Sequence, residues 1–284
     1  MTILIEMRRY GVMKKYEFTD ETKEVNGVVL HRIKAVRDFG SVKAGSLGGF
    51  IKKNSNLSHD GDAWVSDNAQ VSGDARVSGD AWVFGYARVF GNAWVFGDAQ
   101  VSGDAWVSGD AWVSGNAQVF GDTRVFGNAW VFGDAQVFGY ARVSGDARVF
   151  GNARVFGNAQ VSDDARVSGD AQVFDDAQVS GDAWVSGDAW VSGDAWVSGN
   201  AQVSGDAFIK KITDILTVVV IESRDDFTSF YKNKDGGISV ACGCFSGNID
   251  KFFEIVQEVH GDSKYGKIYK KCIELAKMQI IVDE

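Results

Sequence analysis

The chain has 284 residues, of which 45% are hydrophobic, and a formal net charge of −9 at pH 7. This composition argues against wholesale disorder, and the acidic balance argues against direct nucleic-acid binding through a basic surface. The longest apolar run, ILTVVVI at 215–221, is far too short to span a bilayer, so we expect no membrane partner and a cytoplasmic location.

Residues 1–60 are predicted to form a β-rich cap on the repeat that follows them. Within this segment, EVNGVV at 24–29 offers Asn26-Gly27 as the two-residue turn of a β-hairpin. A stack of strands exposes unpaired backbone groups at its open end. We therefore expect residues 1–60 to cover one end of the stack.

A six-residue repeat, A-x-V-[S/F]-[G/D]-[D/N/Y], occupies the chain from Ala63 to Asp206. Its alanine recurs at every sixth position from 63 to 207, in 25 hexads without an insertion, and Thr123 is the single substitution. Such a fixed period predicts a solenoid. We expect A-x-V to form a three-residue strand with Ala and Val inside and x outside. The other three residues form a turn in which glycine takes a positive φ and Asp or Asn bonds its local backbone.

The hexad resembles the repeat of the hexapeptide-repeat, left-handed parallel β-helix proteins, which have an aliphatic residue every six positions and a small residue two before it. The match covers about half the chain, and one departure is that glycine falls two residues after the valine. The resemblance implies triangular coils of three hexads with a left-handed path. The expected fold is therefore mainly β, with about eight coils over 61–209, the cap at 1–60 and a small α+β domain at 210–284.

The x positions fall into three outward ladders when they are arranged at an interval of 18 residues. All nine tryptophans of the chain occupy x, together with only Arg, Gln and one Phe. One ladder contains our candidate binding residues, named here the Trp/Arg strip: Trp94, Trp112, Trp130, Arg148, Arg166 and Trp184. Two interpretations stay open. The flat side chains stack for structural reasons, or they dock a second copy, a partner protein or a sugar ring.

The corner positions are strongly acidic, because residues 61–206 contain 19 Asp against seven Arg. The favoured interpretation is that Asp and Asn cap the turns. Calcium bridging the carboxylates and imitation of a nucleic acid are the functional alternatives. The alternation of Ser and Phe after the valine is expected to be packing of a large ring over a small neighbour.

The composition changes after Phe208. ILTVVVIES and FTSFYKNKDGGISVACGCF are predicted to form strands, with a hairpin loop at 234–237, and two amphipathic helices follow. The first, with Asn248 as its N-cap, has the apolar stripe Ile249, Phe252, Phe253, Val256 and Val259; the second has Tyr265, Ile268, Tyr269, Cys272, Leu275 and Ala276. We expect Cys242, Cys244 and Cys272 to be core thiols, because C-x-C is a poor zinc spacing.

Enzymes of the hexapeptide-repeat family place a catalytic histidine near an extruded loop, and that resemblance raises acyltransferase activity. In this chain His31, His59 and His260 all lie outside the repeats, and no loop interrupts them. We therefore predict no catalytic residue, no cofactor and no metal site.

Two short stretches resemble bacterial and phage proteins. VKAGSLGGF at 42–50 is similar to the leader of phage and bacterial hexapeptide-repeat proteins, and CGCF at 242–245 is similar to a terminal domain of phage and prophage proteins. The resemblance implies a phage association and, with it, the host cytoplasm. The sequence predicts a non-enzymatic scaffold for a protein partner or self-association, with an acidic decoy as the alternative and a degenerate acyltransferase third.

Overall fold

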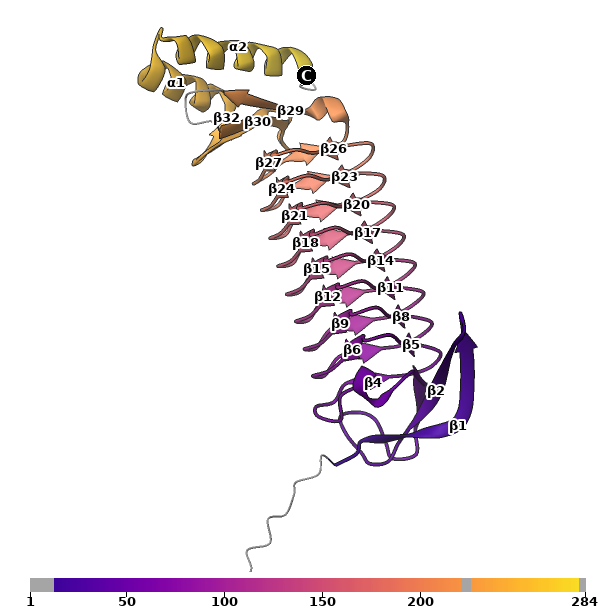
Figure 1. Ribbon diagram of the computed structural model, residues 1–284. Helices are drawn as coiled ribbons and strands as arrows, with labels where there is room; N and C mark the ends of the chain where they lie inside the picture. Colours follow the sequence, from indigo (N-terminus) through magenta and orange to yellow (C-terminus); the bar gives the residue numbers. More distant parts are fainter. Residues whose placement is uncertain (1–12, 221–225, 281–284) are drawn as a thin grey trace, which may run out of the picture.

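A parallel β-solenoid of about nine turns forms the body of the molecule, with a cap at each end (Figure 1). The computed structural model describes residues 13–220 and 226–280. It confirms the expected fold class, with stacked parallel coils, a β-rich start and a C-terminal part of four strands and two helices. The solenoid has about one turn more than expected, because β3 (Leu47–Ile51) and Leu57 already pair in parallel with the first regular hexads.

The repeat forms 25 short strands, from β4 (Trp64–Val65) to β28 (Phe208–Ile209). Each consists of the x residue and the Val or Ile after it, so the bounds recur every six residues. The predicted three-residue strand was one residue too long. The alanine amide instead turns back into the corner, as Ala75 N does toward Ser72 O at 3.3 Å, while the alanine carbonyl accepts the x amide of the preceding coil.

Every third strand pairs in parallel, at an interval of 18 residues, and the pairs build three faces. The first face runs from β4 to β28 and the third from β6 (Arg76–Val77) to β27 (Gln202–Val203). The second face runs from β5 (Gln70–Val71) to β26 (Trp196–Val197) and is extended by three strands of the N-terminal cap. Valine pairs with valine, as Val101 does with Val119, so the x residues also align from coil to coil.

The valines and alanines of the repeat fill the inside of the solenoid and are at most 1% exposed. Each buried valine contributes roughly 1.5–3 kcal/mol relative to exposure. Thr123 fits the alanine column because its hydroxyl donates to Phe120 O at 2.8 Å, which satisfies the buried oxygen. The core is therefore one continuous column rather than a central cluster.

The glycine of each corner serves two purposes. In the repeat its φ lies between 57° and 77°, and a Cβ at Gly79 would lie 2.8 Å from Gly97 N of the next coil. Asp67, Asp163 and Asp175 occupy the same position with φ of 56–58°. Each of these carboxylates accepts the amide of the glycine one coil later, which compensates for the strained backbone.

The corner asparagines bond to the next coil, whereas the sequence predicted local turn capping. Five amides donate to the aspartate Oδ1 18 residues later, at 2.8–3.0 Å: Asn92, Asn116, Asn128, Asn152 and Asn158. An asparagine between aspartates replaces a contact of like charges with a hydrogen bond. The corner columns are therefore part of the stacking, at least where Asn and Asp alternate.

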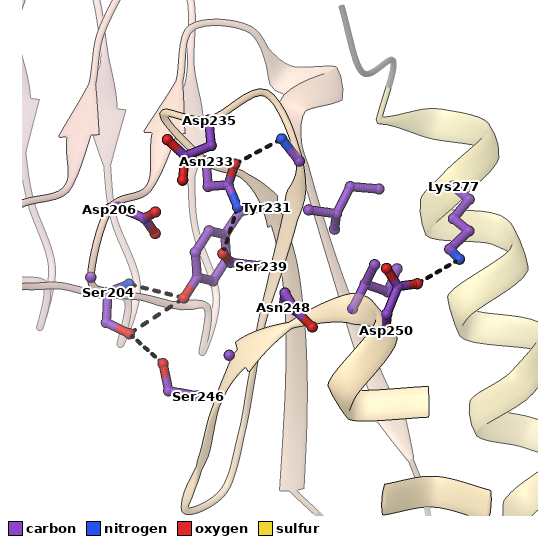
Figure 2. Close-up of a pocket in the computed structure, with 15 residues that line it drawn as sticks. Ser204, Asp206, Tyr231, Asn233, Asp235, Ser239, Ser246, Asn248, Asp250 and Lys277 are labelled. Carbon is purple, nitrogen blue, oxygen red and sulfur yellow. Dashed lines mark hydrogen bonds and ion pairs between the residues drawn. The ribbon is translucent and has the colours of Figure 1, made fainter. Parts of the chain in front are cut away.

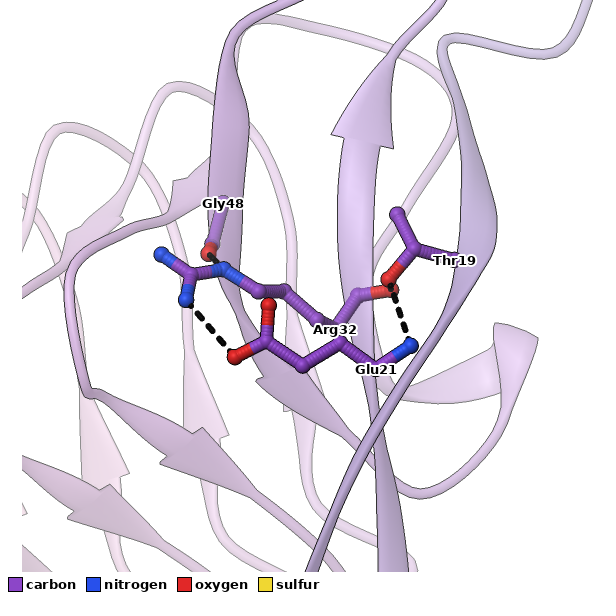
Figure 3. A network of polar contacts seen from close by, with 4 residues as sticks. All are labelled: Thr19, Glu21, Arg32 and Gly48. Carbon is purple, nitrogen blue, oxygen red and sulfur yellow. Dashed lines mark hydrogen bonds and ion pairs between the residues drawn. The ribbon is translucent and has the colours of Figure 1, made fainter.

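The N-terminal cap begins with the predicted hairpin. Strands β1 (Tyr16–Val25) and β2 (Val28–Ala35) pair antiparallel around Asn26 and Gly27, whose φ values are 50° and 75°. Figure 3 shows how Arg32 ties the hairpin to β3: its Nε donates to Gly48 O at 3.1 Å and its Nη1 contacts Glu21 Oε1 at 3.0 Å.

The two glycines of the VKAGSLGGF leader allow β3 to lie directly on the first coil. A Cβ at Gly48 would lie 2.5 Å from Ile33 Cγ1 and 2.7 Å from Trp64 Cζ2, and a Cβ at Gly49 would lie 2.6 Å from Ala69 O. Both positions therefore exclude any side chain.

The ladder has a direction, and the two caps complement it. Amides at the x and Ser/Phe positions donate to carbonyls of the following coil, so the first coil offers carbonyls and the last offers amides. At the start, Lys15 Nζ donates to Gly61 O and Ala63 O at 3.1 and 2.7 Å, and the amide of Asn56, in the 3-10 turn η1 (Asn54–Asn56), donates to Gly73 O and Ala75 O at 3.2 and 2.7 Å. At the end, Gln202 N donates to Ser229 Oγ at 2.9 Å and Ser204 N to Tyr231 OH at 3.4 Å.

The C-terminal part contains an antiparallel sheet of β29 (Ile215–Val220), β30 (Asp226–Lys232), β31 (Ile238–Cys242) and β32 (Phe245–Asn248). It follows the 3-10 turn η2 (Ile212–Asp214), and helices α1 (Ile249–His260) and α2 (Lys264–Gln279) pack beside the sheet (Figure 1). The loop predicted at 234–237 lies between β30 and β31, and Asn248 caps α1 by accepting Lys251 N. The predicted strand at 215–223 extends to Val220, and residues 221–223 lie outside the described range.

Three details of the predicted helices and thiols were wrong. Phe253 and Val259 of α1 are 42% and 66% exposed, and Leu275 of α2 is 48% exposed, because the sheet and the partner helix cover only a narrow stripe of each helix. Ile273, absent from the prediction, is buried instead. Cys244 is exposed in the turn after β31, while Cys242 is half-buried and accepts the Thr228 hydroxyl at 3.0 Å.

Candidate functional site

The six residues of the Trp/Arg strip lie in one ladder on the third face. Parallel pairing sets Trp94 beside Trp112, Trp112 beside Trp130, and Trp130 beside Arg148. The ladder continues through Arg166 to Trp184. The 18-residue interval thus brings together side chains that are up to 90 positions apart in the sequence.

The tryptophans of the strip stack on each other rather than standing free. The ring centroids of Trp94 and Trp112 are 5.4 Å apart and those of Trp112 and Trp130 are 5.0 Å apart, with interplanar angles of 5° and 3°. Guanidinium groups close the stack at both ends, since Arg76 lies 5.1 Å from the Trp94 ring and Arg148 lies 5.2 Å from the Trp130 ring. The ring faces are therefore occupied within the column.

The stack presents the edges of its rings to solvent. Trp94 and Trp130 are 36% and 38% exposed, and Phe96 packs edge-on against Trp112 at 5.9 Å. A sugar ring or a base binds an aromatic residue through its face. Because those faces are covered, the geometry disfavours the sugar-stacking interpretation and favours contact along a flat, edge-lined surface.

Trp184 departs from the stack and shows a contact that sequence reasoning missed. Its indole Nε1 donates to Ser168 Oγ at 3.1 Å, and Trp196 makes the same bond to Ser180 Oγ at 3.1 Å. In both cases the serine precedes the tryptophan by 16 residues, which is the diagonal neighbour in the preceding coil. That spacing was a signal available in the sequence.

The other tryptophans show that x is not always an exposed position. Trp106 is sandwiched between Arg88 and Arg124, whose guanidinium carbons lie 5.2 and 5.3 Å from its ring. Trp64 is only 3% exposed, because the N-terminal cap covers it and Phe39 packs against its ring at 5.3 Å. The expectation that every indole faces water was therefore wrong at the first coil.

The phenylalanines after the valines form columns of their own. Phe120, Phe138, Phe156 and Phe174 stack with centroids 4.9 Å apart and interplanar angles of 1–2°. The sequence predicted a ring over a small neighbour, whereas in this column like stacks on like. This position is thus part of the packing, as expected, with a different partner.

A cleft of about 720 Å³ lies between the last coil and the C-terminal part (Figure 2). Its lining is polar and includes Asp206, Asn233 and Asp250. Asn233 bonds Ser239 Oγ at 3.1 Å, and Lys277 Nζ lies 3.3 Å from Asp250 Oδ1. The sequence gave no sign of this cleft, because its walls come from segments that meet only in the folded chain.

The histidines occupy structural positions. His59 stacks on Tyr16 at 4.3 Å and its Nδ1 accepts Lys15 N at 3.2 Å; burial, followed by the nearby Lys15 charge, lowers its pKa. His260 packs against Tyr269 at 5.4 Å. Within residues 13–220 and 226–280 no group of three His, Cys, Asp or Glu side chains is placed to hold a metal ion.

The fold and the ladder define the chain as a β-solenoid repeat protein. A family model described as the YdcK beta-solenoid repeat matches residues 69–85, 99–115, 141–157, 147–161, 159–175 and 177–193. These segments cover separate parts of the solenoid, so the similarity concerns the repeat alone. A search of curated proteins found no match.

The helices offer no membrane anchor. Neither α1 nor α2, nor any other helix in the described ranges, is long and apolar enough to cross a bilayer.

Proposed function

We propose that the protein is a non-enzymatic binding or assembly scaffold that contacts a protein partner or a second copy through the Trp/Arg strip. The single observation that supports it most is the flat, edge-lined column of aromatic and guanidinium groups on a rigid face. Such exposed Trp and Arg residues are those that dominate protein interfaces. The association with a phage or prophage, and hence with a host cytoplasm, belongs to this proposal and rests on the two resembling stretches.

The proposal is tested with the full chain as bait. The wild type, a Trp94/Trp112/Trp130→Gln variant and a Trp106→Gln variant are immobilised and offered host lysate together with a separately tagged second copy. Glutamine already occupies x in other coils, so all three chains should fold. A partner retained by wild type and Trp106→Gln but lost by the triple variant supports the strip as the binding surface. Retention that is equal in all three contradicts it.

The acidic corners favour a second candidate, a decoy for a nucleic-acid-binding protein. Asp62, Asp80 and Asp98 follow each other in one corner column, with Asp80 Oδ1 accepting Asp62 N at 2.9 Å. Displacement of DNA from a generic DNA-binding protein at low salt would support this function. If no displacement occurs at any concentration of the chain, the decoy is rejected.

A further inference from the structure

We infer that the third face is the contact surface of an antiparallel homodimer whose twofold axis passes through Trp130. The inference rests on the proposed binding function and names a second copy of this chain as the occupant. From the first coil onward, the ladder reads Arg76, Trp94, Trp112, Trp130, Arg148, Arg166, Trp184 and Gln202. The rows are evenly spaced along a straight face (Figure 1), so a second copy can oppose them row by row.

The order of side chains in this ladder is self-complementary under such an axis. With Trp130 facing Trp130, Arg148 faces Trp112 of the second copy, Arg166 faces Trp94, and Arg76 faces Trp184. Every arginine of the face then opposes a tryptophan, and no two arginines meet. Gln202, beside which residues 243–246 of the C-terminal part lie, stays outside the paired rows.

Other arrangements oppose like charges or lose these pairs. Moving the axis by one row toward the C-terminus sets Arg148 against Arg148, and a parallel dimer opposes each arginine to itself. An antiparallel dimer of the second face, centred on the ladder, sets Arg124 against Arg142. Like charges that face each other across an interface are destabilising. The third face with its axis at Trp130 avoids all of these contacts.

The corners add charge complementarity to the same arrangement. Asp110 lies two residues before Trp112, and Asp98 lies four residues after Trp94; both are exposed. Arg148 and Arg166 of one copy would therefore reach Asp110 and Asp98 of the other. Exposed ion pairs weaken in salt, so the dimer should dissociate as the ionic strength rises.

The size of the face sets the expected strength. Seven rows at about 4.8 Å by a three-residue width of about 10 Å give roughly 340 Å² of flat area per copy. A stable interface takes about 800 Å² per partner. We therefore expect a weak dimer that forms reversibly as the concentration rises.

The experiment uses one substitution at two neighbouring rows of the full chain. Trp112→Glu places a carboxylate opposite Arg148, so sedimentation at low salt should give a dimer at least as tight as that of the wild type. Trp130→Glu places two carboxylates on the axis and should weaken the dimer at least tenfold. Trp106→Glu, on the second face with a similar exposure of 37%, should leave it unchanged. Circular dichroism checks that every variant folds.

The outcomes separate the dimer from the binding function. A wild type that remains monomeric to several hundred micromolar at low salt overturns the dimer, while a strip-dependent partner in the bait experiment would still support the scaffold. Equal weakening by Trp112→Glu and Trp130→Glu also overturns the inference, because it removes the specific pairing of rows. The conservative Trp130→Gln variant, which adds no charge, should weaken the dimer less than Trp130→Glu.

Discussion

At the residue scale, the side chain after each valine determines how the tryptophan of the next coil is held. Where that residue is phenylalanine, the ring meets the indole edge-on, as Phe90 does with Trp106 at 6.0 Å. Where it is Ser168, the indole N–H donates to the hydroxyl at 3.1 Å. The same tryptophan position is therefore served by an aromatic contact or by a hydrogen bond. This explains why both residue types recur at one site of the hexad.

A single buried amine makes the stability of the N-terminal cap depend on pH. Lys15 is 0% exposed, and burial lowers its pKa to about 8, against the opposing effect of Asp62. Its unfolded pKa is near 10.5. Between these two values the unfolded chain binds more protons than the folded chain, so stability rises with pH.

We predict that this gain disappears in Lys15→Met. Urea unfolding at pH 7 and at pH 9.5 should show that the wild type gains on the order of 1 kcal/mol relative to Lys15→Met as the pH rises. Burial raises the pKa of Tyr16, which opposes the gain only where the unfolded phenol ionises, near pH 10 and above. A pH dependence identical in both chains would contradict the assignment of Lys15.

At the scale of elements, the caps work because the β3 strand and the first coil touch backbone to backbone. Gly48→Ala is predicted to lower the free energy of unfolding by about 1–3 kcal/mol, because the new methyl group would lie 2.5 Å from Ile33 Cγ1. The measurement is urea unfolding. Gly237→Ala is the control, since its Cβ would meet Asn233 only at 3.4 Å and the stability should hardly change. Equal losses in both variants would show that the leader glycines are not special.

At the scale of the whole molecule, each coil contacts chiefly the coils before and after it, so stability should be nearly a sum of neighbour terms. Deleting residues 133–150, one full coil of 18 residues, should leave a folded protein with the same circular dichroism per residue and a melting temperature changed by only a few degrees. Deleting residues 133–141, half that length, shifts the phase of the hexads and should prevent folding. If the full-coil deletion also unfolds, the coils are not independent units.

Much of the fold could be predicted because the hexad states its geometry 25 times. The alignment of Trp94, Trp112 and Trp130 followed directly from the 18-residue interval. The burial of Trp64 and the exposure of Cys244 did not, because they depend on which distant segment covers each end. The cleft at Asp206 was hidden for the same reason, and the closed faces of the tryptophan stack depend on side-chain orientation rather than on spacing.

The coil length of 18 residues is the claim on which both the strip and the dimer depend. Distances between spin labels at x positions of one ladder test it most directly, in a chain whose three cysteines are first replaced by serine. Labels at Gln100 and Gln172 should be about 19 Å apart and labels at Gln70 and Gln178 about 29 Å apart, because the distance grows by about 4.8 Å per coil. Distances that do not grow in proportion to the number of coils would contradict the account.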